Sequence, residues 1–446
     1  MWHNFRLAGI GGMNRPASVV IIGLGYVGLP LALAFSKAFP TTGFDVDPSR
    51  VDELLAGVDS NREHSTAELK SFNLTFTKDS SCISDAEFIV VAVPTPVTQN
   101  HDPDLRMLHA ASELIGINLR KRSKNLTAPI VVFESTTYPG CTEEFCAPII
   151  ERISGLDSGS DFFLGYSPER TNFGDRTHTV ETVVKVVSGQ TPEVAELISD
   201  TYARIVKAGI HVAANIKTAE ASKVIENVQR DLNIALFNEL AMIFDRMGIR
   251  SSDVFDAAST KWNFHPYEPG LVGGHCIPVD PYYLTYASSK FGYDARVVLA
   301  GREVNERVPD FLADKVLTLI SSDAAGKSGP SVLLLGLTFK ANVFDIRNSK
   351  ALELADLLIE RDVELEVYDP IGRISEPDGV DYRFVDDPFE FAKTYDAVIF
   401  AVSHDVLLER KDDIVNLVKM GGVVVDLVSA LSQSDVELLG RTYWRL

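Results

Sequence analysis

The residue types best suited to chemistry lie together in the stretch GGHCIPVDPYYL, residues 273–284. Cys276 is the candidate nucleophile, because a thiol is the side chain that attacks carbon most readily near neutral pH. The two glycines before it allow a ligand to approach closely, and the prolines after it stiffen the chain. A single cysteine is also often a small buried hydrophobe, so this stretch alone leaves a structural thiol open.

A second pair of candidates lies on a long segment that must be a helix. From Ala213 to Met247 the chain contains neither glycine nor proline, which predicts one continuous helix that connects domains. Lys223 and Asn227 are four residues apart and therefore project from the same face, where both could donate hydrogen bonds to one oxyanion. Without further context, the two side chains fit a solvated polar face better than an oxyanion site.

The amino-terminal part predicts a dinucleotide-binding unit. Residues 18–22 are expected to form a buried strand, GLGYVG follows at 23–28, and an apolar helix comes next. Asp45 lies seventeen residues after the last of these glycines, where such folds use an acid to bind the adenosine ribose. This acid favours NAD over NADP, although Arg50 leaves NADP open. The candidate cofactor residues here are Gly23, Gly25, Tyr26, Val27, Gly28, Asp45 and Arg50.

Polar residues follow three of the next expected strands. We expect strands at 87–93, 129–134, 162–165 and 183–187, with helices near 105–119, 143–152 and 193–205. The motifs VPTP, ESTTYPG and YSPER come after the first three, at the carboxyl ends where open parallel sheets bind ligands. Thr95, Thr136 and Glu169 are therefore site candidates, with ordinary loop caps as the alternative.

A second α/β unit is expected after the segment GKSGP at 326–330. A helix near 297–307 precedes the boundary, and strands within 331–340, 363–370, 395–402 and 421–428 with a helix at 349–360 follow it. The first of these strands lacks a second glycine fingerprint, so we expect a nucleotide at the sheet edge rather than another dinucleotide. Lys340 and Arg347 are available for its phosphates.

These elements predict an α/β protein with two Rossmann-like, doubly wound parallel-sheet domains joined by a long central helix and a small helical domain. The expected boundaries are 1–212, 213–325 and 326–446. A length of 446 residues is consistent with two or three domains. We expect the first twelve residues to be a loose extension, with Met13 as an alternative start.

The composition limits the classes of partner. The net charge of -20 argues against nucleic acid as a partner, because a polyanion would be repelled. The four cysteines have neither CxxC spacing nor neighbouring metal ligands, so we expect no metal site and no disulfide framework. We expect no membrane partner, because the uncharged stretch 17–36 holds the glycine fingerprint and is not an anchor. A reducing cytoplasm fits these features.

The order of motifs resembles the UDP-glucose/GDP-mannose dehydrogenase family over nearly the whole chain. The motifs that carry the resemblance are GLGYVGLP, VPTP, ESTTYPGCTEE, GYSPER, KVIENVQRDLNIALFNELA, KWNF, PGLVGGHCIPVDPYYL and GLTFKANVFDIRNSKALEL. They are most similar to the subgroup that makes UDP-N-acetylhexosaminuronic acids of the Vi-antigen and O-antigen type. The resemblance implies an amino-terminal NAD domain, a central helical domain that forms a homodimer, and a carboxy-terminal domain that binds a UDP-sugar.

The resemblance also implies a reaction and a role for each matching residue. A C6 alcohol would be oxidised by two NAD through an aldehyde, a thiohemiacetal and a thioester, which water then hydrolyses. Cys276 would be the nucleophile, Lys223 and Asn227 would hold the oxyanion, Glu169 would be the general base, and Asp280 with Thr136 would orient water. The same family pattern places Thr95, Thr136 and Arg347 at the cofactor, and Glu169, Arg170, Lys223, Asn227 and Lys340 at the substrate.

Two departures from the family pattern and several rival functions stay open. Relatives that oxidise UDP-glucose carry a lysine where this chain has Val279, and Phe173 replaces a glutamate that follows the motif matching YSPER. We therefore expect UDP-GlcNAc or UDP-GalNAc as substrate, with UDP-glucose and UDP-ManNAc as alternatives. A two-electron dehydrogenase or epimerase would need no thiol, and a nucleotide-sugar binding protein would need no cofactor.

Overall fold

The structure is a computed structural model that describes residues 16–61, 63–70, 73–171, 174–175, 177–321, 329–371 and 383–446. The expected amino-terminal extension, Met13, Phe173 and residues 326–328 of the expected boundary lie outside these described residues. The chain forms two compact units. The first runs to Glu226 and includes Tyr282–Asp294, and the second comprises Asn227–Pro281 and Ala295–Leu446.

The first unit is built on a sheet with the strand order β3-β2-β1-β4-β5-β6-β7-β8. The order reverses between β1 and β4, as in doubly wound folds, and the ligand-binding crevice of such folds lies at the carboxyl ends on either side of this point. The strands are β1 (Val19–Ile22), β2 (Thr41–Phe44), β3 (Leu74–Thr77), β4 (Phe88–Val91), β5 (Ile130–Phe133), β6 (Phe163–Tyr166), β7 (Lys185–Gly189) and β8 (Ile210–Val212).

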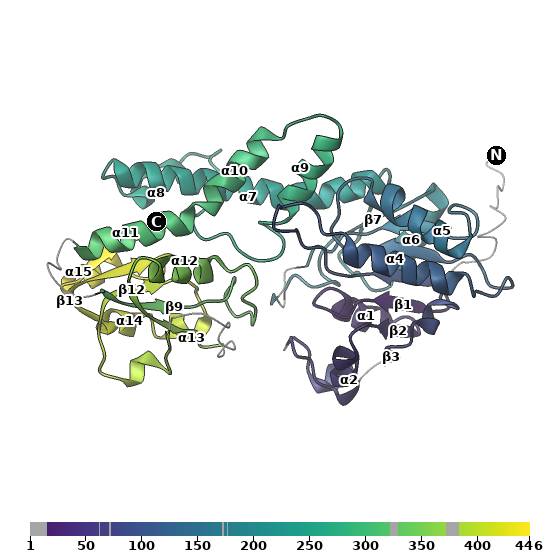
Figure 1. The fold of residues 1–446 in the computed structure, drawn as a ribbon, viewed down its shortest axis with the longest axis horizontal. Helices are drawn as coiled ribbons and strands as arrows, with labels where there is room; N and C mark the ends of the chain where they lie inside the picture. Colours follow the sequence, from purple (N-terminus) through teal and green to yellow (C-terminus); the bar gives the residue numbers. More distant parts are fainter. Residues whose placement is uncertain are drawn as a thin grey trace. The chain divides into compact units, whose positions relative to one another are not determined.

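Helices connect the strands of this sheet (Figure 1). Those of the first unit are α1 (Gly28–Ser36), α2 (Pro48–Ala56), α3 (Thr66–Leu69), α4 (Arg106–Leu119), α5 (Ala147–Ser154), which follows a π-helical turn at Thr142–Cys146, α6 (Pro192–Tyr202) and most of α9 (Asp280–Lys290).

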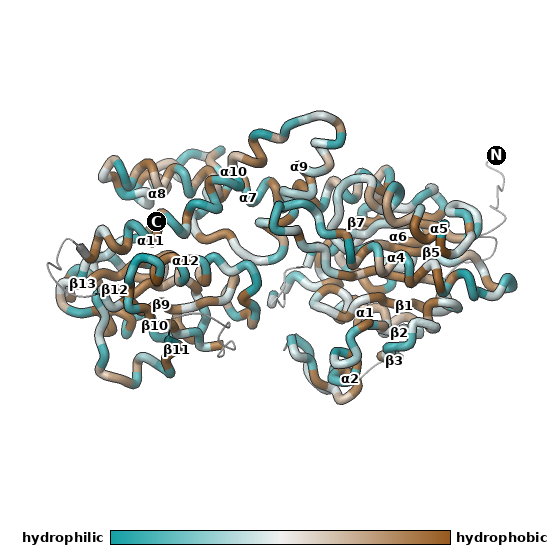
Figure 2. The backbone as a smooth tube through the Cα atoms, viewed as in Figure 1, coloured by the Kyte–Doolittle hydropathy of each residue, from teal (hydrophilic) through white to brown (hydrophobic). Residues whose placement is uncertain are grey.

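The central strands are buried on both faces. Alternate residues such as Val19, Ile21 and Val90 pack with apolar side chains of α1 and α6 in one core. The residues between them, among them Val20 and Ile89, are equally buried and point to the opposite face, since side chains alternate along a strand. Continuous apolar strands are typical of a sheet covered on both sides, and they appear as brown segments in Figure 2.

One strand pair departs from the expected parallel arrangement. From β3 to β6 all neighbouring strands are parallel, but β6 and β7 are antiparallel, with Tyr166 opposite Ser188. The described part of the connection between them contains no helix, whereas parallel neighbours are usually linked by a helical crossover. The chain therefore turns back along β6 after the YSPER motif.

The second unit repeats the strand order of the first six strands of the other sheet. Its sheet is β11-β10-β9-β12-β13-β14, and every neighbouring pair is parallel. The order again reverses between the first strand and the fourth, here β9 and β12. The strands are β9 (Ser331–Leu335), β10 (Glu364–Tyr368), β11 (Arg383–Phe384), β12 (Tyr395–Phe400), β13 (Val418–Asp426) and β14 (Thr442–Trp444).

Two apolar cores cover the faces of this second sheet. Val332 and Leu334 point to a core with α11 and α12, and Leu333 and Leu335 point to one with α13, α14 and α15. The helices are α8 (Ser251–Ser259), α10 (Arg296–Glu306), α11 (Val308–Ser321), α12 (Lys350–Ile359), α13 (Asp405–Glu409), α14 (Lys411–Ile414) and α15 (Gln433–Leu438). The α/β class with two Rossmann-like sheets is therefore confirmed.

The predicted long helix is α7, which runs without interruption from Ile216 to Arg246. The chain passes from the first unit to the second within this helix, after Glu226. Lys223 and Asn227 lie one turn apart on it. Within the described part of the chain, no helix combines the length and apolarity needed to cross a lipid bilayer.

Candidate active site

The glycine fingerprint forms the turn between β1 and α1, and each glycine has its own geometric reason. Gly23 has φ 91°, and a Cβ on it would lie 2.8 Å from the Ala92 carbonyl oxygen. A Cβ on Gly28 would lie 1.8 Å from the Gly23 oxygen, so helix and turn are in close contact. Beside Gly25, by contrast, the space within 4 Å of a Cβ is empty. This open backbone at a helix N-terminus fits a pyrophosphate.

Asp45 follows β2 and is tied to the same turn. Its Oδ2 accepts a hydrogen bond of 2.7 Å from the Leu24 amide, and its Oδ1 accepts one of 2.9 Å from the Asp47 amide. Arg50 also reaches the turn, since its Nε donates to the Leu24 carbonyl at 2.9 Å. Its guanidinium is bound by the carboxylates of Glu53 and Asp59. Arg50 therefore carries a charge that is already compensated.

Glu169 and Lys223 are brought together in the first unit. The Nζ of Lys223 lies 3.8 Å from Glu169 Oε2, and both side chains are largely buried. Glu169 also accepts a hydrogen bond from the Thr171 hydroxyl. Its neighbour Arg170 is held by the Val184 carbonyl at 2.8 Å and by the Glu226 carboxylate at 2.7 Å.

Thr95 and Thr136 lie after β4 and β5, at the same edge of the sheet as the YSPER turn after β6, and both are half-buried. The loop of Thr95 is anchored by Tyr283, whose hydroxyl donates to the Pro96 carbonyl at 3.1 Å. The loop of Thr136 is anchored by Ser135, whose hydroxyl donates to the Val93 carbonyl at 2.6 Å. The expected grouping at the carboxyl ends of these strands is therefore present.

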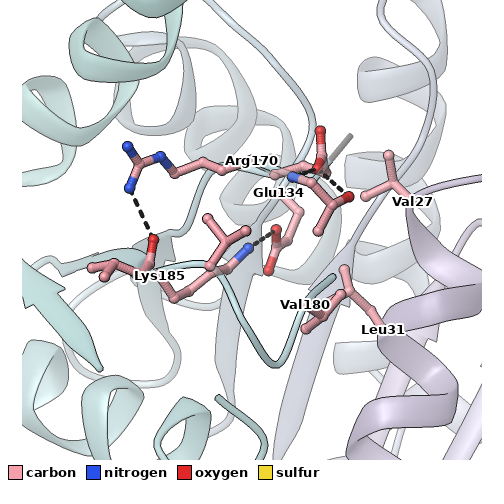
Figure 3. Close-up of a pocket in the computed structure, with 10 residues that line it drawn as sticks. Val27, Leu31, Glu134, Arg170, Val180 and Lys185 are labelled. Atoms are coloured by element: carbon pink, nitrogen blue, oxygen red, sulfur yellow. Dashed lines mark hydrogen bonds and ion pairs between the residues drawn. The ribbon is translucent and has the colours of Figure 1, made fainter. Parts of the chain in front are cut away.

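Sequence reasoning missed a buried polar group under the YSPER turn. Glu134 directly after β5, Lys185 in β7 and Tyr202 in α6 are all buried, and the Glu134 carboxylate accepts hydrogen bonds from both of the others. Figure 3 shows the bond between Lys185 and Glu134. Burial raises the pKa of Glu134, and the charge of Lys185 opposes this effect. Two sequence signals pointed to the group: an acid directly after the apolar run IVVF, and a lysine inside the apolar run VVKVV.

In the second unit, Cys276 lies in a turn that leads into α9. The residue is partly exposed, and its carbonyl accepts hydrogen bonds from the amides of Val279 at 3.1 Å and Asp280 at 2.9 Å. The two glycines before it meet protein atoms: a Cβ on Gly273 would lie 2.6 Å from the Asn348 oxygen, and one on Gly274 would lie 2.6 Å from the Phe339 ring. These glycines therefore let the turn pack closely on the loop that follows β9.

Asn227 and Asp280 form a buried pair next to this turn. The Asn227 amide nitrogen donates to Asp280 Oδ2 at 2.6 Å, and both side chains are less than a tenth exposed. A carboxamide nitrogen carries two hydrogens, so the second can still donate elsewhere. The structure thus fixes the direction of the Asn227 amide.

A cavity in the second unit lies at the reversal point between β9 and β12. Its volume is about 630 Å³, including space open to solvent. It is lined by the loops after β9 and β12, by the start of α12 and by the glycine segment before Cys276, including Gly270, Thr338, Lys340, Lys350 and Ser403. The position and the lysines are those expected for a nucleotide. Arg347 does not line this cavity, although it lies nearby in the sequence. Its side chain is mostly exposed, and its guanidinium donates hydrogen bonds to both carboxylate oxygens of Asp345.

Two dinucleotide-type sheets, a fingerprint turn and a cysteine segment beside a nucleotide-sized cavity define a nucleotide-sugar dehydrogenase. Comparison with known proteins leads to the same class. Models of the UDP-glucose/GDP-mannose dehydrogenase family match residues 17–206 (NAD binding domain), 217–307 (central domain) and 333–433 (UDP binding domain). The chain belongs to this family.

Individual relatives match along most of their length. Protein CapL of Staphylococcus aureus is 45% identical over 97% of this chain and 100% of its own. A UDP-N-acetyl-D-glucosamine 6-dehydrogenase of Pseudomonas aeruginosa is 45% identical over 95% of this chain and 99% of its own. A solved structure of UDP-D-ManNAc dehydrogenase from Pyrococcus horikoshii superposes with a TM-score of 0.82 at 27% identity, covering 96% of this chain and 98% of the other.

Proposed function

We propose that the chain is an NAD-dependent UDP-N-acetylhexosamine 6-dehydrogenase, which oxidises the C6 hydroxyl of UDP-GlcNAc or UDP-GalNAc to a carboxylate. The observation that carries the proposal is the segment around Cys276: a partly exposed cysteine followed by the buried Asp280, which holds the Asn227 amide in place. The name of the 45% identical relative from Pseudomonas aeruginosa supports this substrate class.

The need for a thiol follows from the chemistry. Oxidation of a primary alcohol to an acid removes two hydrides from one carbon, and NAD, when bound, accepts a hydride in each oxidation. After the first oxidation the Cys276 sulfur adds to the aldehyde, which gives a thiohemiacetal with another hydride to lose. The second oxidation leaves a thioester on Cys276. Water then attacks its carbonyl carbon, the C–S bond breaks, and each sugar consumes two NAD and one water.

Five other side chains have proposed roles in these steps. Lys223 and the second N–H of Asn227 donate to the oxygen that becomes negative, each contributing about 3 kcal/mol by analogy with oxyanion holes. Glu169 takes the proton of the attacking water, and its distance of 3.8 Å from Lys223 supports a common site for the two. Asp280 and Thr136 orient that water.

We propose NAD rather than NADP as the oxidant. Gly23, Gly25, Tyr26, Val27 and Gly28 would hold the pyrophosphate at the N-terminus of α1, with Asp45 on the adenosine ribose. A 2'-phosphate would be repelled by Asp45. Arg50 offers it little compensation, because Glu53 and Asp59 already bind the guanidinium. We assign the remaining cofactor contacts to Thr95, Thr136 and Arg347.

The UDP-sugar would occupy the cavity between β9 and β12, with Lys340 at its phosphates and Arg170 at the sugar end. Val279 lies where relatives acting on UDP-glucose carry lysine, and this departure supports an N-acetylhexosamine over glucose. We further propose the domain limits 1–212, 213–325 and 326–446, a homodimer formed through the middle domain, and a cytoplasmic role in surface polysaccharide synthesis.

A substrate panel tests the assignment. We expect kcat/KM with NAD to be larger for UDP-GlcNAc or UDP-GalNAc than for UDP-ManNAc or UDP-glucose, measured from NADH absorbance. A larger value for UDP-glucose than for both N-acetylhexosamines would refute the substrate class. A larger value for UDP-ManNAc would reassign the chain within the family.

A further inference from the structure

The ammonium group of Lys185 is bonded to the ends of two neighbouring strands at once. Its Nζ donates to the Glu134 carboxylate, at the end of β5, at 2.5 Å and to the Pro168 carbonyl, after β6, at 2.8 Å. The hydroxyl of Tyr202 donates to the other oxygen of Glu134 at 2.5 Å, and the ammonium lies 5.4 Å from the centre of the Tyr202 ring. Figure 3 shows Lys185 and Glu134 joined beneath the turn that carries Arg170.

Stability alone does not account for such a group. Taking two charges out of water costs several kcal/mol per ion, and an apolar set of the same volume often stabilises a fold equally well. Glu134 has no exposed surface, and Lys185 is 6% exposed, so both charges bear this cost almost in full. The hydrogen bonds of the charged group instead fix the orientation of the side chains and loops that they join, because each partner has a defined donor or acceptor.

The loops that this group orients are the ones that carry two residues of the proposed site. Glu134 lies two residues before Thr136, and Pro168 lies directly before Glu169. A single ammonium therefore holds the two loops that carry the proposed water-orienting hydroxyl and the proposed base. Displacement of a catalytic group by about 1 Å can lower the reaction rate about a hundredfold.

We propose that Lys185, Glu134 and Tyr202 are positioning residues that align Thr136 and Glu169 for hydrolysis of the thioester. The inference rests on the proposed function and adds to it three residues to which that function gives no role. Hydrolysis is the step expected to depend on them most, because it is the step in which Glu169 and Thr136 act on water.

The test is the pair variant Glu134→Gln with Lys185→Met, which removes both charges together and so leaves no buried unpaired ion. We expect it to retain the initial release of two NADH per active site, whereas its steady-state rate falls at least about tenfold. Sugar should accumulate on Cys276, seen as added mass of the intact protein, and KM for the UDP-sugar should fall together with kcat, so that kcat/KM changes little. Unchanged steady-state turnover would overturn the inference.

Two further variants separate the possible causes. Lys207→Met also removes a lysine of the first unit, but one that is exposed and bonded to Glu181, and it should behave as wild type. If the pair variant does not fold, Tyr202→Phe removes a single hydroxyl and should still slow the steady state more than the initial phase; equal slowing of both would overturn the inference. A wild-type protein that forms fewer than two NADH per sugar would instead refute the proposed function.

Discussion

Cys276 carries the chemical claim at the scale of single residues, and replacing its sulfur by oxygen tests it. In Cys276→Ser the hydroxyl can still add to the aldehyde, though weakly, and the second oxidation then leaves an ester, which hydrolyses more slowly than a thioester. We expect at most about two NADH per active site, followed by a stall with sugar bound to the protein. Mass spectrometry of the intact protein detects the adduct.

Cys276→Ala is the matched control, since it should form no adduct at all. Sustained turnover of the serine variant near the wild-type rate, without added mass, would return Cys276 to a structural role.

Asp45 should determine the choice of cofactor. Replacement by alanine removes the acceptor for the ribose hydroxyls and should raise KM for NAD about tenfold, the usual effect of losing a hydrogen bond to a charged group. The same replacement should also reduce the preference of the enzyme for NAD over NADP. Since Asp45 accepts from the Leu24 amide as well, Asp45→Asn, which keeps one acceptor oxygen, is the control for damage to the turn. An unchanged NAD/NADP ratio in Asp45→Ala would show that this carboxylate is not at the ribose.

Some of these residues could be predicted from sequence and others could not. Asp45 and the glycines follow one another at a characteristic spacing in the sequence, so a sequence pattern is sufficient to find them. The pairing of β5, β6 and β7 and the position of α6 bring together Glu134, Lys185 and Tyr202. This contact joins residues far apart in the chain, so the local sequence does not predict it. A charged residue in an apolar run indicates a buried partner, but not which one.

At the scale of elements, α7 holds a second loop through Glu220. This side chain is buried in the second turn of the helix, and its carboxylate accepts hydrogen bonds from the amides of Gly140 and Thr142. Burial raises the pKa of Glu220 to about 7, against the effect of these hydrogen bonds. Glu220 therefore holds the chain where the ESTTYPG motif ends and the π-helical turn begins.

The raised pKa predicts a dependence of stability on pH. The folded protein keeps a proton on Glu220 up to about pH 7, whereas the unfolded chain releases it near 4.5. The stabilisation is therefore complete below pH 4.5 and is lost as the pH rises through 7, by up to about 3 kcal/mol. In Glu220→Gln the fall in unfolding temperature between pH 5 and pH 8 should be smaller than in wild type.

Thermal unfolding at several pH values measures this difference. The exposed Glu144→Gln is the matched control and should follow wild type, because its carboxylate is largely in water. Parallel curves for wild type and Glu220→Gln would contradict the assignment of this titration to Glu220.

Strong periodicity made most elements predictable. The apolar strands and α7 lie within a few residues of their predicted ends. The edge strand β3 was missed because its four residues are only partly buried and carry no apolar run. The helix α11 was not predicted, although its Pro309 lies in the first turn, where a helix tolerates proline. The direction of β7 depends on its connection to β6, which no propensity describes.

At the scale of the whole molecule, the repeated strand order gives each unit its own ligand edge. In the first unit this edge carries the glycine turn, Asp45 and Glu169, and in the second it carries Lys340 and the cavity. The net charge of -20 means that anionic ligands must be held by such local cations, since the long-range field repels them. One fold is therefore used twice, in the NAD binding domain and in the UDP binding domain of this family.

The number of NADH formed per sugar tests the central claim most directly. With a limiting, known amount of UDP-GlcNAc or UDP-GalNAc and excess NAD, the account predicts two NADH for each sugar consumed and a carboxylate as product, identified by mass. In the proposed mechanism both oxidations precede release of the product from Cys276, so no free aldehyde should accumulate. One NADH per sugar with an aldehyde or ketone as product, or no NADH at all, would contradict the account.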